Sequence, residues 1–261
     1  MRIVVLSKPV PDTTGQERLG ADGRVDRVAG PNVVNGNDEY AVEAALRLVE
    51  ADPAGGEVTL LAMAPANAPE TLRKALAMGA TRAVLVTDPA LEGSCAVSTT
   101  RVLAAALRGL DFDLVLAGAD TSDGGGGIVA AGVAALLGLP YLSYAARIEP
   151  ADGRVRVRRI TPTGYDVIEA AMPAVITATQ TLGEPRYPSL RGIMGARGKE
   201  IVVRTVADLG LRGADVGGAV ATSRLVRTSV PASRGTARMV RGAPQEAARE
   251  VVAFLDERRL I

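Results

Sequence analysis

Short apolar runs alternate with longer stretches of helical periodicity over the first half of the chain. The runs at residues 2–7, 57–63, 83–87 and 113–118 carry almost no polar alternation, so they predict strands buried on both faces. Helical spacing of apolar residues predicts helices at residues 38–50, 68–78, 95–107 and 128–137. This alternation predicts an α/β fold: a Rossmann-like, mostly parallel sheet with right-handed crossovers and helices on both faces.

Local signals place several ends of these helices. Pro69 suits a first helical turn, and Ser94 is the expected N-cap of the helix at residues 95–107. Gly138 and Pro140 are expected to end the fourth helix.

The pattern changes after Pro140. Strands are predicted at residues 142–148, 154–161 and 165–171, joined by turns at Asp152 with Gly153 and at residues 162–164. Arginines nearly alternate with valines along the second of these strands, which suits a strand with one wet face. The sheet is therefore expected to carry an antiparallel extension before a last buried strand at residues 174–177.

From about Glu200 the chain is rich in Gly, Ala, Ser and Arg, which predicts a looser arm. Residues 244–260 predict an amphipathic helix at its end. We expect an α/β domain at residues 1–200 and a C-terminal arm and helix at residues 201–261. The arm either folds onto its own domain or reaches over a partner.

Composition removes several classes of function. The chain has 261 residues and no histidine, which excludes Ser-His-Asp or Cys-His catalysis and histidine-ligated metal. A net charge of +1 does not favour nucleic acid as a partner. Cys95 is the single cysteine, so no internal disulfide forms and a cytoplasmic location is expected. No apolar run reaches the roughly 18 residues of a membrane span, and the first run is too short for a signal peptide.

The strongest ligand signal is a polar, glycine-rich turn between the strand at residues 113–118 and the next helix. Residues 124–127 are all glycine, so a phosphate could approach the backbone and the helix N-terminus closely. The alternative is a flexible loop without a ligand. The loop lacks a Walker lysine and a complete dinucleotide fingerprint, which favours a nucleotide that is held and not hydrolysed.

Asp120 and Asp123 lie in this turn, and Asn35 and Asn37 precede the first helix. Asp120 and Asp123 could bind a ribose or cap the turn, and Asn35 or Asn37 could cap the first helix, with Asn37 better placed. Cys95 at a helix N-terminus could have a lowered pKa, although a small buried thiol is the favoured interpretation.

Residues 183–200 form a predicted loop of unusual composition. Apolar side chains at Leu190, Ile193 and Met194 stand among arginines and a lysine. Such a loop either contacts another molecule or packs its apolar residues into the core.

Several stretches together carry a family resemblance that covers nearly the whole chain. They are IVVLSKPVPDT, NDEYAVEAALRL, ETLRKALAMGATRAVLV, GSC, LAGADTSDGGGG with AALLGLPYL after it, and EPRYPSLRGIM. The chain resembles the beta subunit of electron transfer flavoprotein, in particular the bacterial, non-bifurcating members. Its glycine loop differs from the DGDT type of bifurcating relatives, which argues against a second FAD in place of AMP.

The resemblance implies a heterodimer with an alpha subunit that holds most of the FAD, while this chain binds a structural AMP. The implied AMP site consists of Leu6, Asn35, Gly36, Asn37, Asp38, Met63, Gly118, Ala119, Asp120, Thr121, Ser122, Asp123, Gly124, Gly125, Gly126, Gly127, Ile128 and Val129. Asp12 and Thr13 are implied to approach the flavin. The domain at residues 1–200 is then the nucleotide-binding domain, and the arm is one that wraps the partner subunit.

The resemblance also implies a carrier and not an enzyme. Electrons would come from acyl-CoA dehydrogenases and related flavin dehydrogenases, as in fatty acid β-oxidation, and pass to a membrane quinone oxidoreductase. The implied recognition loop consists of Arg186, Tyr187, Pro188, Ser189, Leu190, Arg191, Gly192, Ile193, Met194 and Gly195, with Leu190 as the anchor in an apolar pocket.

Two other functions remain open. A stand-alone adenine-nucleotide-binding module of similar fold would not need the loop at residues 183–200. An ATP-using ligase or hydrolase is disfavoured, because the sequence shows neither a phosphate-binding lysine nor a magnesium site.

Overall fold

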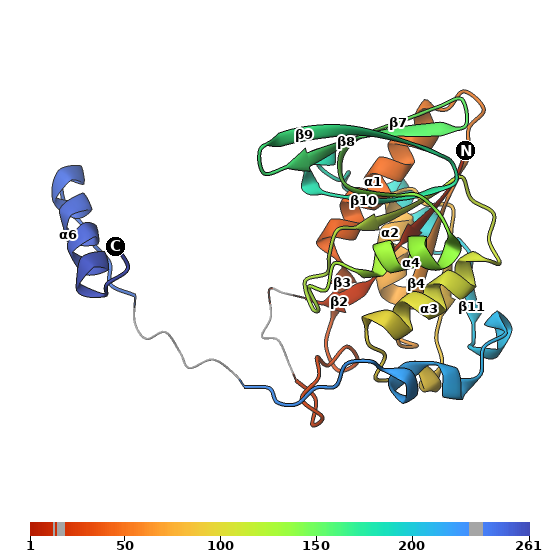
Figure 1. Cartoon of the computed structure of the whole chain (residues 1–261), viewed down its shortest axis with the longest axis horizontal. Coiled ribbons are helices and arrows are strands. Elements are labelled where there is room, and N and C mark those ends of the chain that lie inside the picture. Colours follow the sequence, from red (N-terminus) through yellow and green to blue (C-terminus); the bar gives the residue numbers. More distant parts are fainter. Residues whose placement is uncertain (13, 15–18, 230–236) are drawn as a thin grey trace. The chain divides into compact units, whose positions relative to one another are not determined.

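The computed structural model describes residues 1–12, 14, 19–229 and 237–261 (Figure 1). The chain folds into two compact units, Met1–Val226 and Arg227–Ile261. Within the described ranges, none of the helices combines the length and the apolar character needed to cross a membrane.

The described part of the first unit contains one sheet of nine strands, in the order β11-β5-β4-β1-β6-β10-β7-β8-β9 (Figure 1). All neighbours from β11 to β7 pair in parallel, and β7, β8 and β9 pair antiparallel. The strands are β1 Arg2–Leu6, β4 Glu57–Met63, β5 Arg82–Val86, β6 Leu114–Gly118, β7 Tyr141–Ala151, β8 Arg154–Thr161, β9 Gly164–Ala171, β10 Ala174–Ala178 and β11 Ile201–Arg204. The predicted parallel sheet with an antiparallel extension is confirmed.

Helices cover both faces of the parallel part. The helices are α1 Gly36–Ala51, α2 Pro69–Met78, α3 Ala96–Leu107 and α4 Val129–Leu137. Side chains of α1 and α2 pack in one apolar cluster with Ile3 and Val5 of β1, whereas α3 and α4 pack in a second cluster with Val4 and Leu6. Both faces of β1 are therefore buried, which explains its continuous apolar run.

Three local signals act as the sequence predicts. Pro69 begins α2, and Gly138 ends α4 in the left-handed conformation with φ 67°. Asp152 and Gly153 both have positive φ, 50° and 74°, as the two-residue hairpin between β7 and β8 requires.

Two predicted helix starts were wrong by one or two residues. Cys95, not Ser94, occupies the N-cap of α3, and the Ser94 hydroxyl instead donates to the Leu91 carbonyl at 2.7 Å. Asn35, not Asn37, stands at the N-cap of α1, and its side chain makes no capping bond because it is used elsewhere.

The prediction that the chain loosens from Glu200 was also wrong for the residues that follow directly. Strand β11 pairs with β5, and the short 3-10 helices η3 Ala207–Leu209, η4 Gly213–Asp215 and η5 Gly217–Val220 follow it. Val206 and Val216 are buried in the second core cluster. Outside the main sheet, β2 Pro9–Pro11 and β3 Asn32–Val34 form a small antiparallel pair that the sequence pattern did not predict.

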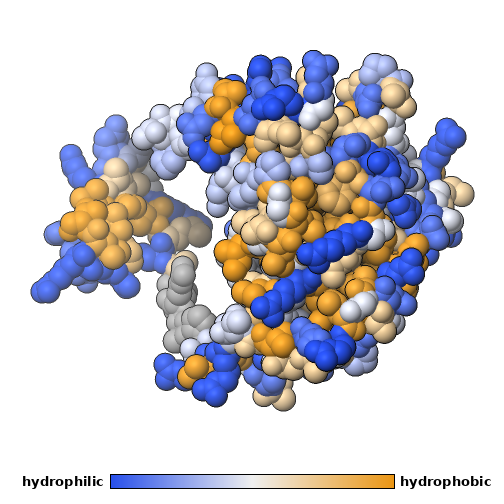
Figure 2. All heavy atoms as spheres, turned by 45° about the vertical axis from the view of Figure 1, so that its right-hand side comes forward, coloured by the Kyte–Doolittle hydropathy of each residue, from blue (hydrophilic) through white to orange (hydrophobic). Residues whose placement is uncertain are grey.

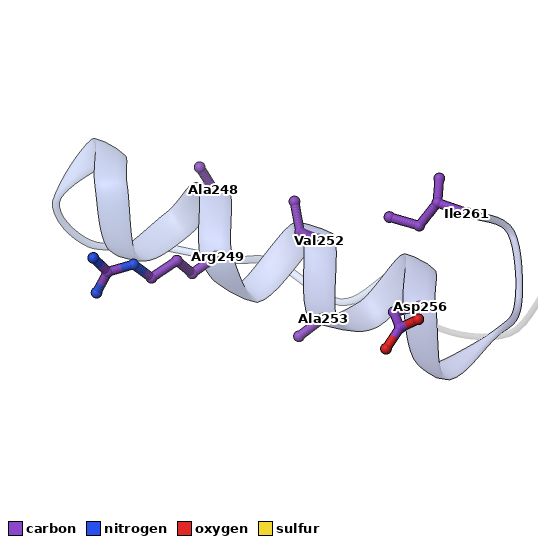
Figure 3. A pocket seen from close by; sticks show the side chains of 6 residues that line it. All are labelled: Ala248, Arg249, Val252, Ala253, Asp256 and Ile261. Atoms are coloured by element: carbon purple, nitrogen blue, oxygen red, sulfur yellow. The ribbon is translucent and has the colours of Figure 1, made fainter.

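The second unit consists of a helix, α6 Pro244–Glu257, with the residues around it. No residue of α6 is buried, and Figure 2 shows its hydrophobic residues gathered together with hydrophilic residues around them. Ala248, Val252 and Ile261 point to the same side in Figure 3. The predicted amphipathic helix is confirmed.

Candidate functional site

The glycine loop, residues 119–128, lies where the chain order of the sheet reverses. From β1 the sheet grows through β4 to β5 on one side, and β6 lies on the other side of β1. In open parallel sheets, the crevice outside the strand ends at such a reversal is the usual ligand site. The loop follows the carboxyl end of β6 directly and leads into α4.

Asp38 ties together the ends of the two strands at this point. Its Oδ2 accepts a hydrogen bond from the backbone N–H of Lys8 (2.8 Å), and its Oδ1 accepts one from Gly118 (3.1 Å). A Cβ on Gly118 would lie 2.5 Å from Asp38 Oδ1, so only glycine allows this approach. Asp38 is therefore a buried link between β1 and β6.

Two asparagines at the start of α1 hold the first half of the loop. Asn35 donates from Nδ2 to the carbonyl of Asp120 (2.8 Å) and accepts from the N–H of Ser122 (3.2 Å). Asn37 donates to the Asp120 carboxylate. The side chains that the sequence offered as helix caps serve instead to fix the loop.

The second half of the loop leaves its backbone open. Gly125 and Gly127 have φ of 55° and 60°, which L side chains rarely adopt, and nothing lies within 4 Å of a Cβ built on Gly125 or Gly126. Ile128 is the N-cap residue of α4 and makes no side-chain capping bond, and the N–H groups of the first turn of an α-helix have no intrahelical partner. Open backbone beside a helix N-terminus fits the phosphate of a nucleotide.

The Asp123 side chain makes contacts that the sequence did not suggest. Its side chain is only 2% exposed and accepts hydrogen bonds from Lys8 Nζ (2.7 Å) and Arg27 Nε (2.7 Å). Burial by itself would raise the pKa of Asp123, but the two cations outweigh it and lower that pKa. The carboxylate is thus engaged inside the protein.

Two further predicted nucleotide residues stand at the carboxyl ends of neighbouring strands, β1 and β4. Leu6 is buried in the sheet, and Met63 is half-buried at the end of β4, beside β1. Asp12 is close to the small β2–β3 pair and accepts hydrogen bonds from the N–H (2.9 Å) and hydroxyl (2.7 Å) of Thr14. Thr13 lies outside the described residues.

A second cluster of predicted site residues forms the docking segment, residues 183–200. The expected loop contains a short helix, α5 Leu190–Ala196, whose N-cap Ser189 accepts a hydrogen bond from the N–H of Gly192 (3.1 Å). A Cβ on Gly192 would lie 2.4 Å from the Ala77 carbonyl oxygen, so α5 packs directly on α2. The backbone of this segment is therefore fixed in position.

Apolar side chains of the docking segment face away from the core. Tyr187 is 97% exposed and Leu190 is 75% exposed, and Ile193 and Met194 are exposed as well. The interpretation that Leu190 and Ile193 fill the core was wrong. A well-supported exposed apolar surface of this kind is typical of a protein contact site.

The arginines of the segment do not all surround this surface. Arg186 donates to both oxygens of buried Glu43 (2.7 and 3.3 Å) and to Glu50 on α1 (2.6 Å). These partners raise the pKa of Arg186 further. Arg186 is thus a structural anchor, whereas Arg191 and Arg197 remain exposed.

Comparison with known proteins decides the family. A family model described as an electron transfer flavoprotein domain matches residues 22–209. The chain is 39% identical over 264 residues to the electron transfer flavoprotein subunit beta of Mycobacterium tuberculosis, and 99% of each chain is covered. The chain belongs to the electron transfer flavoprotein beta subunit family. It is also 34% identical to the electron transfer flavoprotein subunit beta of Thermoanaerobacterium thermosaccharolyticum, with 100% of each chain covered.

A relative with a different name also matches this chain over the full length of both proteins. The chain is 35% identical to the caffeyl-CoA reductase-Etf complex subunit CarD of Acetobacterium woodii, with 100% of each chain covered. Members of the electron transfer flavoprotein family carry electrons as flavoprotein subunits, which agrees with the resemblance seen in the sequence.

The sequence reasoning missed three residues that lie beside predicted nucleotide residues. Lys8 and Arg27 reach the glycine loop from other segments, and Ser7 has a buried hydroxyl that lacks a hydrogen-bond partner, a property no other described side chain shares. Ser7 and Lys8 directly follow an apolar strand, and this position was the available signal. Nothing in the pattern around Arg27 indicated its contact.

Cys95 differs from the favoured interpretation. It is not fully buried, and its Sγ accepts a hydrogen bond from the N–H of Thr222 at 3.4 Å. Burial would raise the pKa of Cys95, but hydrogen bonds from the Ser98 N–H and from the hydroxyl and N–H of Thr222 lower it to about 6. The alternative interpretation, a thiol with a lowered pKa, is the one that the structure favours.

Asp38 predicts a pH dependence of stability. Burial raises its pKa from 3.8 to about 7, against the lowering effect of the hydrogen bonds from Lys8, Asn35 and Gly118. In the unfolded chain this carboxyl loses its proton near pH 3.8, so the folded state holds an extra proton up to about pH 7. Its contribution to stability is complete below about pH 4 and is lost as the pH rises towards about 7.

Asp38→Asn removes this titration. We expect the difference in unfolding free energy between wild type and variant to decrease by roughly 2–3 kcal/mol from about pH 5 to about pH 7. Urea unfolding followed at several pH values in that range measures it. A difference that stays constant with pH would show that Asp38 does not titrate there.

Proposed function

We propose that this chain is the beta subunit of a cytoplasmic heterodimer that carries FAD and one structural AMP. The heterodimer accepts electrons from acyl-CoA dehydrogenases and related flavin dehydrogenases and passes them to a quinone oxidoreductase. This subunit supplies the AMP site and the docking segment. No residue of the chain is proposed as a catalytic acid or base.

One combination of features supports this function best. Open glycine backbone follows strand β6 at the switch point of the sheet, and an exposed apolar helix is firmly attached to the same domain. A module that only binds adenine nucleotides has no use for the second feature. The sequence of the loop, which is not of the DGDT type, supports AMP and not a second FAD.

The parts of the chain receive distinct roles. The domain at residues 1–200 holds AMP, and Asp12 and Thr13 approach the flavin of the alpha subunit. The C-terminal residues from 201 supply β11 to the sheet and then the arm. The exposed apolar side chains of α6, Val251 and Val252 among them, support a contact of this helix with the alpha subunit.

Co-expression with the neighbouring alpha subunit tests the proposal. We expect a stable heterodimer from which FAD and AMP are released in equal amounts on denaturation, measured by absorbance and chromatography. A stable heterodimer without flavin would overturn the carrier function, and two FAD with no AMP would overturn the AMP site. The same preparation with a chain that ends at Val226 is expected to pair more weakly, whereas unchanged pairing would contradict the role of the arm.

A further inference from the structure

Lys8 brings a positive charge to the glycine loop from a distant part of the chain. It lies just past the carboxyl end of β1, and the bond from its backbone N–H to Asp38 fixes its position. Its Nζ lies 3.4 Å from Thr121 Oγ1, and a Cβ built on Gly124 would be 3.8 Å from it. The ammonium group therefore lies against the loop that the sequence showed to lack a lysine of its own.

The local charges leave this ammonium available to an anion. Asp123 is shared between Lys8 and Arg27, so one buried carboxylate faces two cations. The other carboxylate of the loop, Asp120, is hydrogen-bonded to Asn37. An ammonium has three donors, and within the described residues two of them are used, on Asp123 and Thr121. The N-terminus of α4 adds partial positive charge to the same loop.

We propose that Lys8 contacts the phosphate of the nucleotide bound by the glycine loop, and that Asp123 is the positioning residue that holds the Lys8 ammonium there. The inference rests on the AMP site proposed above and assigns to it a residue from outside the loop. The positive charge then comes from the end of β1, and the loop itself needs only glycine backbone.

A purely structural role for Lys8 is the competing explanation. In that case the lysine only neutralises the buried Asp123. Arg27 offers a matched control, because it binds the other oxygen of the same carboxylate at 2.6 Å and is similarly exposed. Loss of either cation disturbs Asp123, but only Lys8 also contacts Thr121 and lies near Gly124.

The test compares AMP with adenosine, which lacks the phosphate. Calorimetric titration is made with the heterodimer freed of nucleotide, as wild type and as Lys8→Met, Lys8→Arg and Arg27→Gln variants. For Lys8→Met we expect AMP to bind about tenfold to a hundredfold more weakly, because one charge-assisted contact is lost. Adenosine binding is expected to change only by the small factor that the disturbed Asp123 causes. We expect Lys8→Arg to restore most of the AMP affinity and Arg27→Gln to change AMP and adenosine binding by the same small factor.

The outcomes separate this inference from the proposed function. If wild type binds AMP and Lys8→Met binds it equally well, the role of Lys8 is overturned while the AMP site stands. If Lys8→Met and Arg27→Gln weaken AMP and adenosine alike, Lys8 is only structural and the inference is again overturned. If wild type binds neither compound, the AMP site and the role of Lys8 fail together.

Discussion

Replacement of Glu43 by glutamine is expected to loosen the docking segment and to destabilise the first unit by about 2–3 kcal/mol. The Glu43 side chain is 4% exposed and accepts hydrogen bonds from Arg186 and Arg47 at 2.6–3.3 Å. Burial would raise the pKa of Glu43, yet the two arginines outweigh it and lower that pKa. A glutamine would place its amide N–H group against the N–H donors of the arginines. It would also leave the positive charge of Arg186 and Arg47 without the compensating carboxylate.

Glu50→Gln is the matched control for this prediction. Glu50 binds the same arginine, Arg186, but its side chain is 55% exposed, so its loss is expected to cost less than about 1 kcal/mol. Urea unfolding of the heterodimer reports stability, and the rate of tryptic cleavage at residues 183–200 reports the attachment of the segment. Equal effects of the two variants on both measurements would show that the buried position of Glu43 is unimportant.

Replacement of Leu190 by alanine is expected to lower kcat/KM for reduction by an acyl-CoA dehydrogenase by roughly tenfold to a hundredfold. Leu190 is the first residue of α5, is 75% exposed, and stands on a helix that is fixed to α2. An anchor of this kind carries much of the energy of a small interface, because the partner's pocket is desolvated only when the side chain enters it. The measurement is the rate of FAD reduction at several dehydrogenase concentrations.

Content of FAD and AMP is expected to be unchanged in Leu190→Ala, since the side chain makes little contact with its own domain. Val203→Ala provides the comparison, because Val203 is also an exposed apolar residue, on β11, outside the docking segment. The prediction fails if both variants reduce the rate equally. Loss of cofactor from Leu190→Ala would mean instead that this leucine supports the fold.

Helix α1 supports both candidate sites. In its first turn, Asn37 binds Asp120 of the glycine loop and Asp38 binds Gly118 before it, and its later turns supply Glu43, Arg47 and Glu50 to the docking segment. Residues that face the core in between, such as Ala41 and Ala45, are small and fully buried, so the helix lies close to the sheet. A rigid element of the fold thus fixes the geometry of each site.

The sequence predicted the elements whose signals are local. The doubly buried strand β6 is a continuous apolar run, and the β7–β8 turn needs residues that tolerate positive φ, which Asp152 and Gly153 provide. Family membership was also evident from the sequence, because the matching motifs extend over nearly the whole chain. These features depend on neighbouring residues, so the sequence contains them directly.

Contacts between distant segments could not be derived in the same way. Strand β11 is short and half-exposed, and it is a strand only because β5 offers an open edge to it. The N-cap of α1 was expected at Asn37 and lies at Asn35. The sequence does not show that the Asn35 side chain binds the carbonyl of Asp120, which is 85 positions away. The resemblance implied Arg186 as part of the recognition loop, but the structure pairs it with buried Glu43.

The sequence by itself determined the alternation of strands and helices, the glycine loop, the apolar character of the docking segment and the family. Only the tertiary structure decided which charged side chains form ion pairs. It brought Lys8 and Arg27 to Asp123, and it turned Leu190 outwards while it fixed Arg186 inwards. The reason is physical: backbone conformation follows local chemistry, whereas ion pairs and exposure depend on segments that approach one another only when the sheet has formed.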